Sequence, residues 1–383
     1  MKITDVKLSD PVYISIRQMT DAINVLPTAM TYTFLQVFTD EGITGVVPAQ
    51  GGALSKVLIE DLLKPYVIGE DPLNTERIWE KMYWGSLSSG RRGAAISAIS
   101  AIDIAIWDLK GKIFNQPVHK LLGGHRDTVP AYGSSINRNY TREELIKETT
   151  GYVKSGFKMI KMKIGGRDPN EDLERIKLMR ETIGPNIDLA VDVNNGWSLT
   201  TAIRMAQKIE RYDIYWLEEP ILADEMDNLA KLADETSIPI AVGENHYTKW
   251  EFKELIEQGA VEIVQADIGK CGGVTEFIKI AAMADAYGLP VCPHGSAYIS
   301  VPVVAAVPNG LFSEYIQGIH DPMGQVFIDP IKARDGKVIP SNKPGFGIEL
   351  NEEAIEKLKA KPKPSPEQLR RSTKKGWRWP PYL

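Results

Sequence analysis

Short apolar runs alternate with amphipathic helical stretches along the chain from residue 129 to residue 312. The runs recur about every 25 residues, which is the length of one strand, one helix and their loops. This alternation predicts a parallel sheet, because each helix has to carry the chain back to the start of the next strand. Eight such runs favour a closed barrel over an open doubly wound sheet, which stays the alternative. The predicted strands are 129–132, 159–164, 187–193, 214–217, 238–242, 263–266, 290–292 and 310–312, with helices between them at 172–182, 199–212, 226–236, 249–258 and 274–287.

The chain outside this region has a different pattern, so we expect more than one domain. The beginning predicts a meander of strands at 3–16, 31–39 and 43–47, followed by helices at 54–63, 75–83 and 94–112. Beyond residue 320 the chain is punctuated by Gly and Pro, with one helix expected at 351–360. Prolines in the tail exclude a long helix there, and we expect its Trp377 and Trp379 to pack on another surface.

Acidic residues end three consecutive predicted strands. Asp192, Glu218 and Glu244 stand 26 residues apart in each step. Barrel enzymes carry their chemistry at the C-terminal ends of the strands, and three carboxylates meeting there would repel each other unless a cation lay between them. Oxygen ligands with open positions for a substrate suit Mg²⁺. The alternative is that each acid caps the following helix or pairs with a Lys or an Arg.

Two lysines end the strand that precedes these acids. In Lys161-Met162-Lys163, strand periodicity puts both ammonium groups on one face, which we expect to be the barrel interior. A lysine beside a second cation and a metal has a lowered pKa, which suits a general base. A pair of surface lysines is the alternative.

Three further titratable residues end the later strands. Asp267 is placed to hold the imidazole of His294 in one tautomer, although a helix-capping Asp and an unrelated His would give the same pattern. Glu314 follows the last strand and would donate a proton to a developing oxyanion if burial kept it protonated. Lys163 and the Asp267–His294 pair would then face a bound substrate from opposite sides.

In this order and spacing the residues resemble the enolase superfamily, and specifically its mandelate racemase subgroup. The resemblance covers nearly the whole chain. It rests on Lys161-x-Lys163, Asp192-x-Asn194, Glu218-Glu219-Pro220, Gly243-Glu244-Asn245, Asp267, His294 and Glu314, together with the helix at 97–111 and the following Leu121-Leu122-Gly123-Gly124. It implies an α/β fold: an α+β capping domain at 1–125, a (β/α)7β barrel similar to a TIM barrel at 126–320, and a C-terminal segment at 321–383 that returns to the cap.

The resemblance also implies roles for the site residues. Mg²⁺ would lie on Asp192, Glu218 and Glu244, with Lys163 and His294 as the two bases. Lys161 would help to bind the substrate carboxylate, and Asn194 and Glu314 would contact the substrate. Some sugar-acid dehydratases of the superfamily carry a His where Asn194 stands, so that type of site is disfavoured.

These residues favour abstraction of the proton next to a carboxylate, through an enediolate. We expect dehydration of a sugar acid to a 2-keto-3-deoxy acid, which is the subgroup's most frequent chemistry. Racemisation or epimerisation, and cycloisomerisation, of a 2-hydroxy acid share the intermediate and stay open. A catalytically silent barrel that serves as a binding module is an alternative of another class, and the intact set of residues argues against it. Substrate specificity is expected in the segments 18–28 and 48–53, with Tyr13, Arg17 and Arg91 or Arg92 reaching a polyol or a distal carboxylate.

Composition limits the partners. A formal net charge of -5 without basic runs before the C-terminus argues against nucleic acid. Apolar runs as long as the roughly 18 residues of a membrane span are lacking, so no membrane association is expected. Two cysteines do not make a disulfide framework, which favours a reducing cytoplasm. We expect a homo-oligomer that acts on a small carboxylate.

Overall fold

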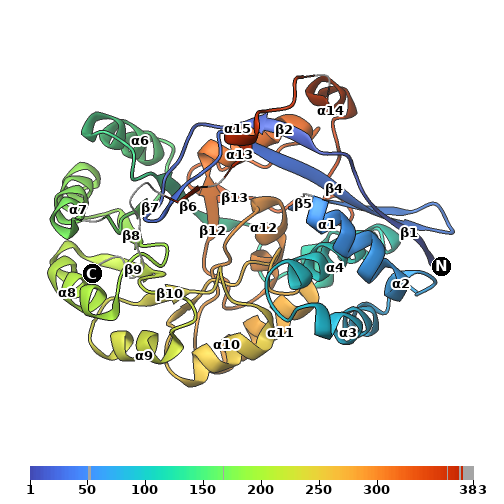
Figure 1. The fold of residues 1–383 in the computed structure, drawn as a ribbon, viewed down its shortest axis with the longest axis horizontal. Coiled ribbons are helices and arrows are strands. Elements are labelled where there is room, and N and C mark those ends of the chain that lie inside the picture. The colour runs from blue at the N-terminus through green and yellow to red at the C-terminus, as the bar shows by residue number, and fades with distance from the viewer. Residues whose placement is uncertain (51–52, 167, 360, 371, 374–383) are drawn as a thin grey trace.

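A curled parallel sheet forms the centre of the molecule (Figure 1). The computed structural model describes residues 1–50, 53–166, 168–359, 361–370 and 372–373. Neighbouring strands follow the order β11-β10-β9-β8-β7-β6-β12. Parallel bridges join Val291 to Val264 on one side and to Gly310 on the other, so the two edges of the sheet are linked and the predicted barrel is confirmed. The strands are β6 (Val129–Ile136), β7 (Met159–Lys163), β8 (Asp188–Asp192), β9 (Ile214–Glu218), β10 (Ile240–Val242), β11 (Ile263–Val264) and β12 (Ser313–Ile316).

Side chains fill the interior of the ring. Each strand from β6 to β11, and the segment around Val291, contributes one residue to a buried cluster. Its members are Tyr132, Met159, Ala190, Trp216, Ala241, Ile263 and Cys292. Since side chains alternate along a strand, Lys161 and Lys163 share the face of Met159, while Met162 points the other way. Both lysines therefore face the barrel interior, as predicted, and the cluster closes the space beneath them.

Helices surround the ring. The five predicted helices are present with small changes at their ends, and the structure adds two helices that the sequence pattern does not predict. These two are α6, which begins at the capping box of Thr141 and Glu144, and α12, which contains Pro302 and is buried along its whole length. The helices are α6 (Arg142–Lys154), α7 (Pro169–Ile183), α8 (Leu199–Ile209), α9 (Met226–Asp234), α10 (Thr248–Glu257), α11 (Gly273–Ala286) and α12 (Ala297–Ala306), with a 3₁₀ turn η3 (Glu210–Tyr212).

An antiparallel sheet with helices forms the cap on one side of the barrel (Figure 1). Its central strand β4 pairs with β1, β2 and β5. The helix α4 packs against both β5 and the barrel helix α11, and Asp103 on α4 accepts hydrogen bonds from the backbone and the hydroxyl of Thr275. The elements are β1 (Ile3–Leu8), β2 (Val12–Ser15), β3 (Asn24–Val25), β4 (Ala29–Thr39), β5 (Thr44–Gln50), α1 (Ala53–Val57), the π-helix η1 (Leu58–Leu63), α2 (Lys64–Val67), α3 (Thr75–Ser86), η2 (Leu87–Ser89), α4 (Ala94–Ile113) and α5 (Val118–Leu121).

The last part of the chain returns to the cap. Figure 1 shows α14 and α15 beside β2 and β4, and β14 pairs with β3. On the way the chain adds β13 to the barrel strand β6. The elements are α13 (Gln317–Met323), η4 (Gly324–Val326), β13 (Lys337–Val338), α14 (Glu352–Lys359), α15 (Pro366–Leu369) and β14 (Ser372–Thr373). The domain boundaries at residues 125 and 320 stay a prediction, and Trp377 and Trp379 lie outside the described residues.

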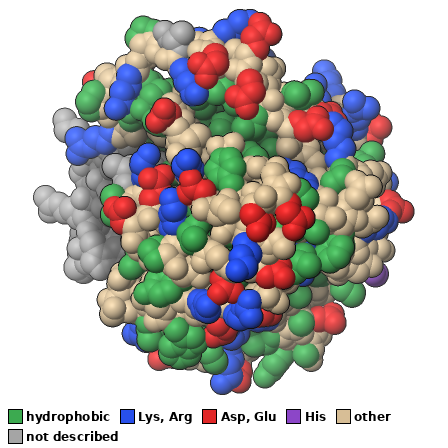
Figure 2. Space-filling model, turned by 90° about the vertical axis from the view of Figure 1, so that its right-hand side faces the viewer, with side chains coloured by type: hydrophobic (Ala, Val, Ile, Leu, Met, Phe, Trp, Pro, Cys, Tyr) green, Lys and Arg blue, Asp and Glu red, His purple; other side chains and the backbone are tan. Residues whose placement is uncertain are grey.

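The side of the molecule that carries α2 and α3 has a mixed charged surface. Figure 2 shows acidic and basic side chains interspersed there, a pattern typical of a solvated face. In the described part of the chain, none of the helices combines the length and the apolar character that a membrane span requires.

Candidate active site

Three charged side chains meet at one level of the barrel mouth. Asp192 and Glu218 are the last residues of β8 and β9, and the strand register pairs Lys163 with Asp192 and Asp192 with Glu218. The two carboxylates are 0% and 1% exposed. Charges so deeply buried need partners, and the neighbouring lysines supply them.

Lys161 lies at the centre of this group. Its Nζ is 2.5 Å from Glu218 Oε1, 3.0 Å from Glu314 Oε1 and 3.5 Å from Asp192 Oδ2. Burial alone would lower the pKa of Lys161, but the carboxylates of Glu218 and Glu314 outweigh burial and hold it above its usual value. The lysine is therefore a fixed positive charge on which carboxylates from three strands converge.

Lys163 lies nearer the rim. Its Nζ donates to Asp192 Oδ2 at 2.8 Å and to Asn194 Oδ1 at 2.7 Å. Burial would lower the pKa of Lys163, but Asp192 outweighs it and raises the pKa. This is the opposite of the lowering expected beside a metal. A divalent cation on Asp192 would repel the ammonium, so a lowered pKa stays a prediction for the metal-loaded site.

The predicted pair of Asp267 and His294 is present. Asp267 Oδ2 is 2.8 Å from His294 Nδ1, which fixes the tautomer that carries a proton on Nδ1. The other ring nitrogen, Nε2, faces the barrel mouth, 3.4 Å from Glu244 Oε2. Burial would lower the pKa of His294, but Glu244 and the hydrogen bond to Asp267 raise it to about 9.

Glu314 is buried but charged. Its Oε1 accepts from Ser134 Oγ at 2.7 Å and from Lys161, whereas its Oε2 has no hydrogen-bond partner among the described residues. Burial would raise the pKa of Glu314, but Lys161 and His294 outweigh it and hold the pKa well below its usual range. The condition for a proton donor, protonation through burial, is therefore not met in this structure, and Oε2 is instead a buried acceptor that lies 3.8 Å from His294 Nε2 without a hydrogen bond among the described residues.

Two of the three predicted metal ligands are already arranged as a hard cation requires, and the third is not. Asp192 and Glu218 both reach the single cation Lys161 Nζ, so their oxygens already converge. Glu244 turns its Oε2 toward His294, and its side chain has to rotate to join them. As they stand, no three acidic, His or Cys side chains in the described part of the chain are arranged to hold a metal ion. The donor chemistry of all three oxygens nevertheless suits Mg²⁺.

Residues beyond the predicted set hold the carboxylates in place. Trp216 Nε1 and Gln265 Nε2 both donate to Glu218 Oε2, at 3.0 and 2.8 Å. Glu219 accepts from the side-chain amides of Asn195 and Asn245, at 2.7 and 2.6 Å, and so ties together the loops after β8 and β10. The sequence gives a signal for Trp216, because a spacing of two residues puts it on the same strand face as Glu218.

Backbone strain marks the same loops. Asn194, Asn195 and Glu219 have φ values of 45°, 62° and 38°, in the left-handed region, which is uncommon for residues other than glycine and which Asn adopts more readily than Glu. Such conformations cluster at functional sites, where the surrounding contacts enforce them. The strain therefore supports the loops after β8 and β9 as part of a site.

The predicted cap segment 18–28 contacts the barrel mouth, residues 51 and 52 of the segment 48–53 lie outside the described residues, and Arg17 and Arg92 are paired elsewhere. Ala22 packs closely against Gly165 in the loop after β7. If residue 165 had a side chain, its Cβ would lie 2.8 Å from the Cβ of Ala22, which is too close for two carbon atoms. Arg17, however, pairs with Glu144 at 2.6 Å on α6. Arg92 pairs with Asp224 at 2.7 Å and with Glu251. Both guanidinium groups are thus engaged by other carboxylates.

Comparison with known proteins gives matches over nearly the whole chain. Residues 3–123 match the model of the mandelate racemase / muconate lactonizing enzyme N-terminal domain, and residues 144–354 match the enolase C-terminal domain-like model. An arabinonate dehydratase of Saccharolobus solfataricus is 37% identical over 371 residues, which covers 94% of this chain and 100% of that one. A 3,6-anhydro-alpha-L-galactonate cycloisomerase of Streptomyces coelicolor is 33% identical, covering 85% and 90%. A racemase structure from Streptomyces coelicolor with bound magnesium superposes with a TM-score of 0.88 at 31% identity, covering 93% and 99%.

Proposed function

Because this chain belongs to the mandelate racemase / muconate lactonizing enzyme family, we propose that it removes the proton next to the carboxylate of a sugar acid and dehydrates the acid to a 2-keto-3-deoxy acid. One observation carries the proposal. Lys163 and the Asp267–His294 pair come from opposite sides of the barrel ring, and the buried carboxylates lie between them. Two acid/base groups on opposite sides of one anion-binding site suit removal of a proton and departure of a β-hydroxyl.

We propose that Asp192, Glu218 and Glu244 hold Mg²⁺. When bound, this ion would polarise the substrate carboxylate and stabilise the charge that builds on it. Lys161, a buried ammonium within reach of two of these carboxylates, would bind one substrate carboxylate oxygen. Glu314 Oε2 and Asn194 Oδ1 would accept hydrogen bonds from substrate hydroxyls.

The two bases divide the proton transfers. One of them, Lys163 Nζ or His294 Nε2, would remove the α-proton, and the configuration of the substrate at that carbon would decide which. The other would protonate the departing hydroxyl. General acid–base catalysis contributes about 10²–10⁴-fold in rate, or roughly 3–6 kcal/mol, whereas enzymes lower barriers by roughly 8–23 kcal/mol. Electrostatic stabilisation of the enediolate therefore has to contribute more than either base.

Racemisation or epimerisation, and cycloisomerisation, stay as second candidates because they need the same α-proton step. The racemase and the cycloisomerase among the relatives favour keeping both. Assembly into a homo-oligomer and a cytoplasmic location stay predictions. A silent binding module is the remaining alternative, and it predicts no chemistry on any acid.

The test is a library of acid sugars assayed with Mg²⁺ in D₂O, with α-deuterium incorporation and 2-keto product measured separately. Dehydration predicts 2-keto product, racemisation predicts inverted acid, and a binding module predicts neither. Lys163→Ala and His294→Asn should separate the roles: loss of the base abolishes both deuterium incorporation and product, whereas loss of the acid abolishes only product. Exposed Lys154→Ala and His125→Asn are the matched controls. Full activity in both site variants would contradict the assignment.

A further inference from the structure

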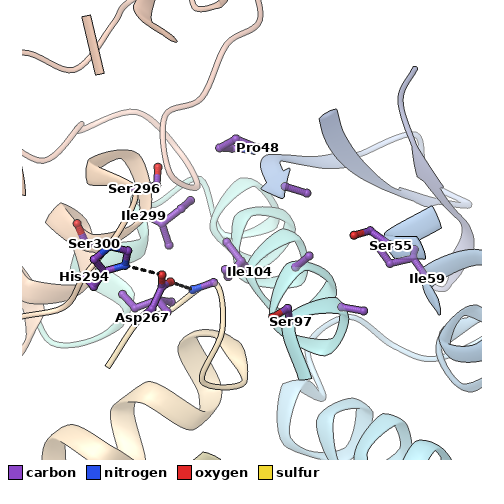
Figure 3. A pocket seen from close by; sticks show the side chains of 15 residues that line it. Pro48, Ser55, Ile59, Ser97, Ile104, Asp267, His294, Ser296, Ile299 and Ser300 are labelled. Carbon is purple, nitrogen blue, oxygen red and sulfur yellow. Dashed lines mark hydrogen bonds and ion pairs between the residues drawn. The ribbon is translucent and has the colours of Figure 1, made fainter. Parts of the chain in front are cut away.

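A cavity of about 80 Å³ lies between the cap and the barrel mouth, and His294 forms part of its wall (Figure 3). We call it the cap cavity. Asp267, His294 and Ile299 line it from the barrel, and Ser55, Ser97 and Ile104 line it from the cap. One water molecule needs roughly 10–15 Å³ of such space, so the cap cavity has room for several non-hydrogen atoms.

Among the residues that the structure describes, His294 is the one side chain on the wall of the cap cavity that can carry a positive charge. Its charged members are Asp267 and His294, which pair with each other at 2.8 Å. Its other polar side chains are serine hydroxyls, and its remaining side chains are apolar. Hydroxyls suit a neutral hydroxyl-bearing or methyl-bearing group, whereas a carboxylate here would be partly desolvated beside a cation that Asp267 already pairs with.

A bound sugar acid has to extend into this space. With its carboxylate at Lys161 and its α-carbon between Lys163 and His294, the rest of the chain cannot continue downward, because Tyr132 and Trp216 are 0% exposed and fill the ring. The cap reaches over the mouth, where Ala22 lies against the loops that carry Gly165 and Gly196. The space that remains beside His294 is the cap cavity.

The cations nearby are already matched by carboxylates. Lys161 and Lys163 pair with Asp192, and Lys270 Nζ donates to the Glu244 carbonyl at 3.1 Å and lies 3.9 Å from Asp267 Oδ2. Of the arginines expected to reach a distal carboxylate, Arg17 and Arg92 are engaged by other carboxylates, as described above, and Arg91 is exposed and does not line the cap cavity. A second carboxylate on the substrate would therefore find no partner among these groups.

We propose that the cap cavity selects sugar acids with one carboxylate and a neutral far end (aldonates) over those with a carboxylate at both ends (aldarates). The proposal rests on the function proposed above and names the class of its substrate. Sites that leave a buried polar or charged group unpaired reject the mismatched ligand strongly. We expect kcat/KM for the best aldonate to exceed that of the aldarate with the same configuration by at least about 10²-fold, which is about 2.8 kcal/mol at 1.4 kcal/mol per factor of ten.

The experiment uses the full chain with Mg²⁺ and matched pairs of five- and six-carbon acids, such as gluconate with glucarate and galactonate with galactarate. Deuterium incorporation at the α-carbon and 2-keto product are followed for every acid. If an aldarate and the matching aldonate had the same kcat/KM, the proposed selectivity would be wrong while the proposed function would stand. Lack of deuterium incorporation with every acid would remove the proposed function, and this inference with it.

Variants test whether the cap cavity is the origin of the selectivity. Ser97→Arg puts a cation on its wall at a half-buried position of α4, and we expect the aldonate preference to fall at least tenfold. Ser97→Met adds comparable bulk without charge and should keep the preference. Ser55→Arg, on the cap helix α1, replaces the first variant if that one does not fold. A folded arginine variant with an unchanged preference would overturn the proposal.

Discussion

Trp216 offers a direct test of how the barrel interior supports metal binding. Its indole donates to Glu218 Oε2 at 3.0 Å, Gln265 donates to the same atom at 2.8 Å, and Lys161 contacts the other carboxylate oxygen. Trp216→Phe removes one of these donors and keeps an aromatic ring against Tyr132, whose centroid is 5.2 Å away. A hydrogen bond to a charged group contributes about 1.5–3 kcal/mol. Because the donor orients a predicted ligand, we expect Mg²⁺ affinity to fall about 10- to 10²-fold.

The assay is calorimetric titration of Mg²⁺ into the wild-type protein and Trp216→Phe, with near-ultraviolet circular dichroism to confirm packing. Trp250→Phe, at a residue that is 56% exposed, makes the same replacement away from the site and should leave Mg²⁺ binding unchanged. Gln265→Met removes the second donor and should weaken binding comparably. Wild-type affinity in a well-packed Trp216→Phe variant would refute the idea that this indole orients Glu218.

Three further outcomes follow from the charges of the molecule. Asp267→Asn should lower kcat/KM by about 10²–10⁴-fold and move the limb of the pH–rate profile that reports His294 to lower pH, because the carboxylate helps to raise that pKa to about 9. Binding of Mg²⁺ at Asp192 should release a proton from Lys163, so the calorimetric enthalpy should depend more strongly on the buffer in the wild type than in Lys163→Ala. Burial raises the pKa of Asp103 from 3.8 to about 7, so the folded state binds this proton more tightly than the unfolded state. Below about pH 4 this group contributes most to the free energy of unfolding, and up to about 4 kcal/mol of that contribution is lost as the pH rises through 7. Urea titrations at several pH values should show this loss of stability in the wild type and not in Asp103→Asn.

The sequence predicts the barrel and the positions of its charged residues because both depend on periodicity. Parallel strands buried on both faces give apolar runs, and the residue after each run has to lie at the barrel mouth. Lys163, Asp192 and Glu218 occupy neighbouring register positions for that reason. The same logic explains a failure: α12 is buried on all sides and contains Pro302, so it has neither a polar face nor an unbroken helical pattern for the sequence to reveal.

The direction of a side chain and its choice of ion-pair partner do not follow the periodicity of the sequence, so the sequence does not predict them. Arg17 was expected over the barrel mouth, but Glu144 on α6 lies 2.6 Å from its guanidinium. Glu244 stands at the predicted strand end, yet its carboxylate turns toward His294. A strand position fixes where a side chain starts, whereas rotamers and competing ion pairs decide where it ends.

The ionisation of Glu314 depends on the whole cluster of charges, so the burial of this one residue does not decide whether it is protonated. Burial alone would protonate it, but Lys161 at 3.0 Å provides a positive charge that is buried as deeply as the carboxylate. Inside a protein, a close opposite charge acts more strongly than in water, so the pair stays charged. Lys161 serves Asp192 and Glu218 in the same way, which links the charge on each carboxylate to the others. A cation that binds two of them competes with Lys161, and the lysine then becomes available to a substrate carboxylate. We therefore predict that metal binding and substrate binding are coupled through the ammonium group of Lys161.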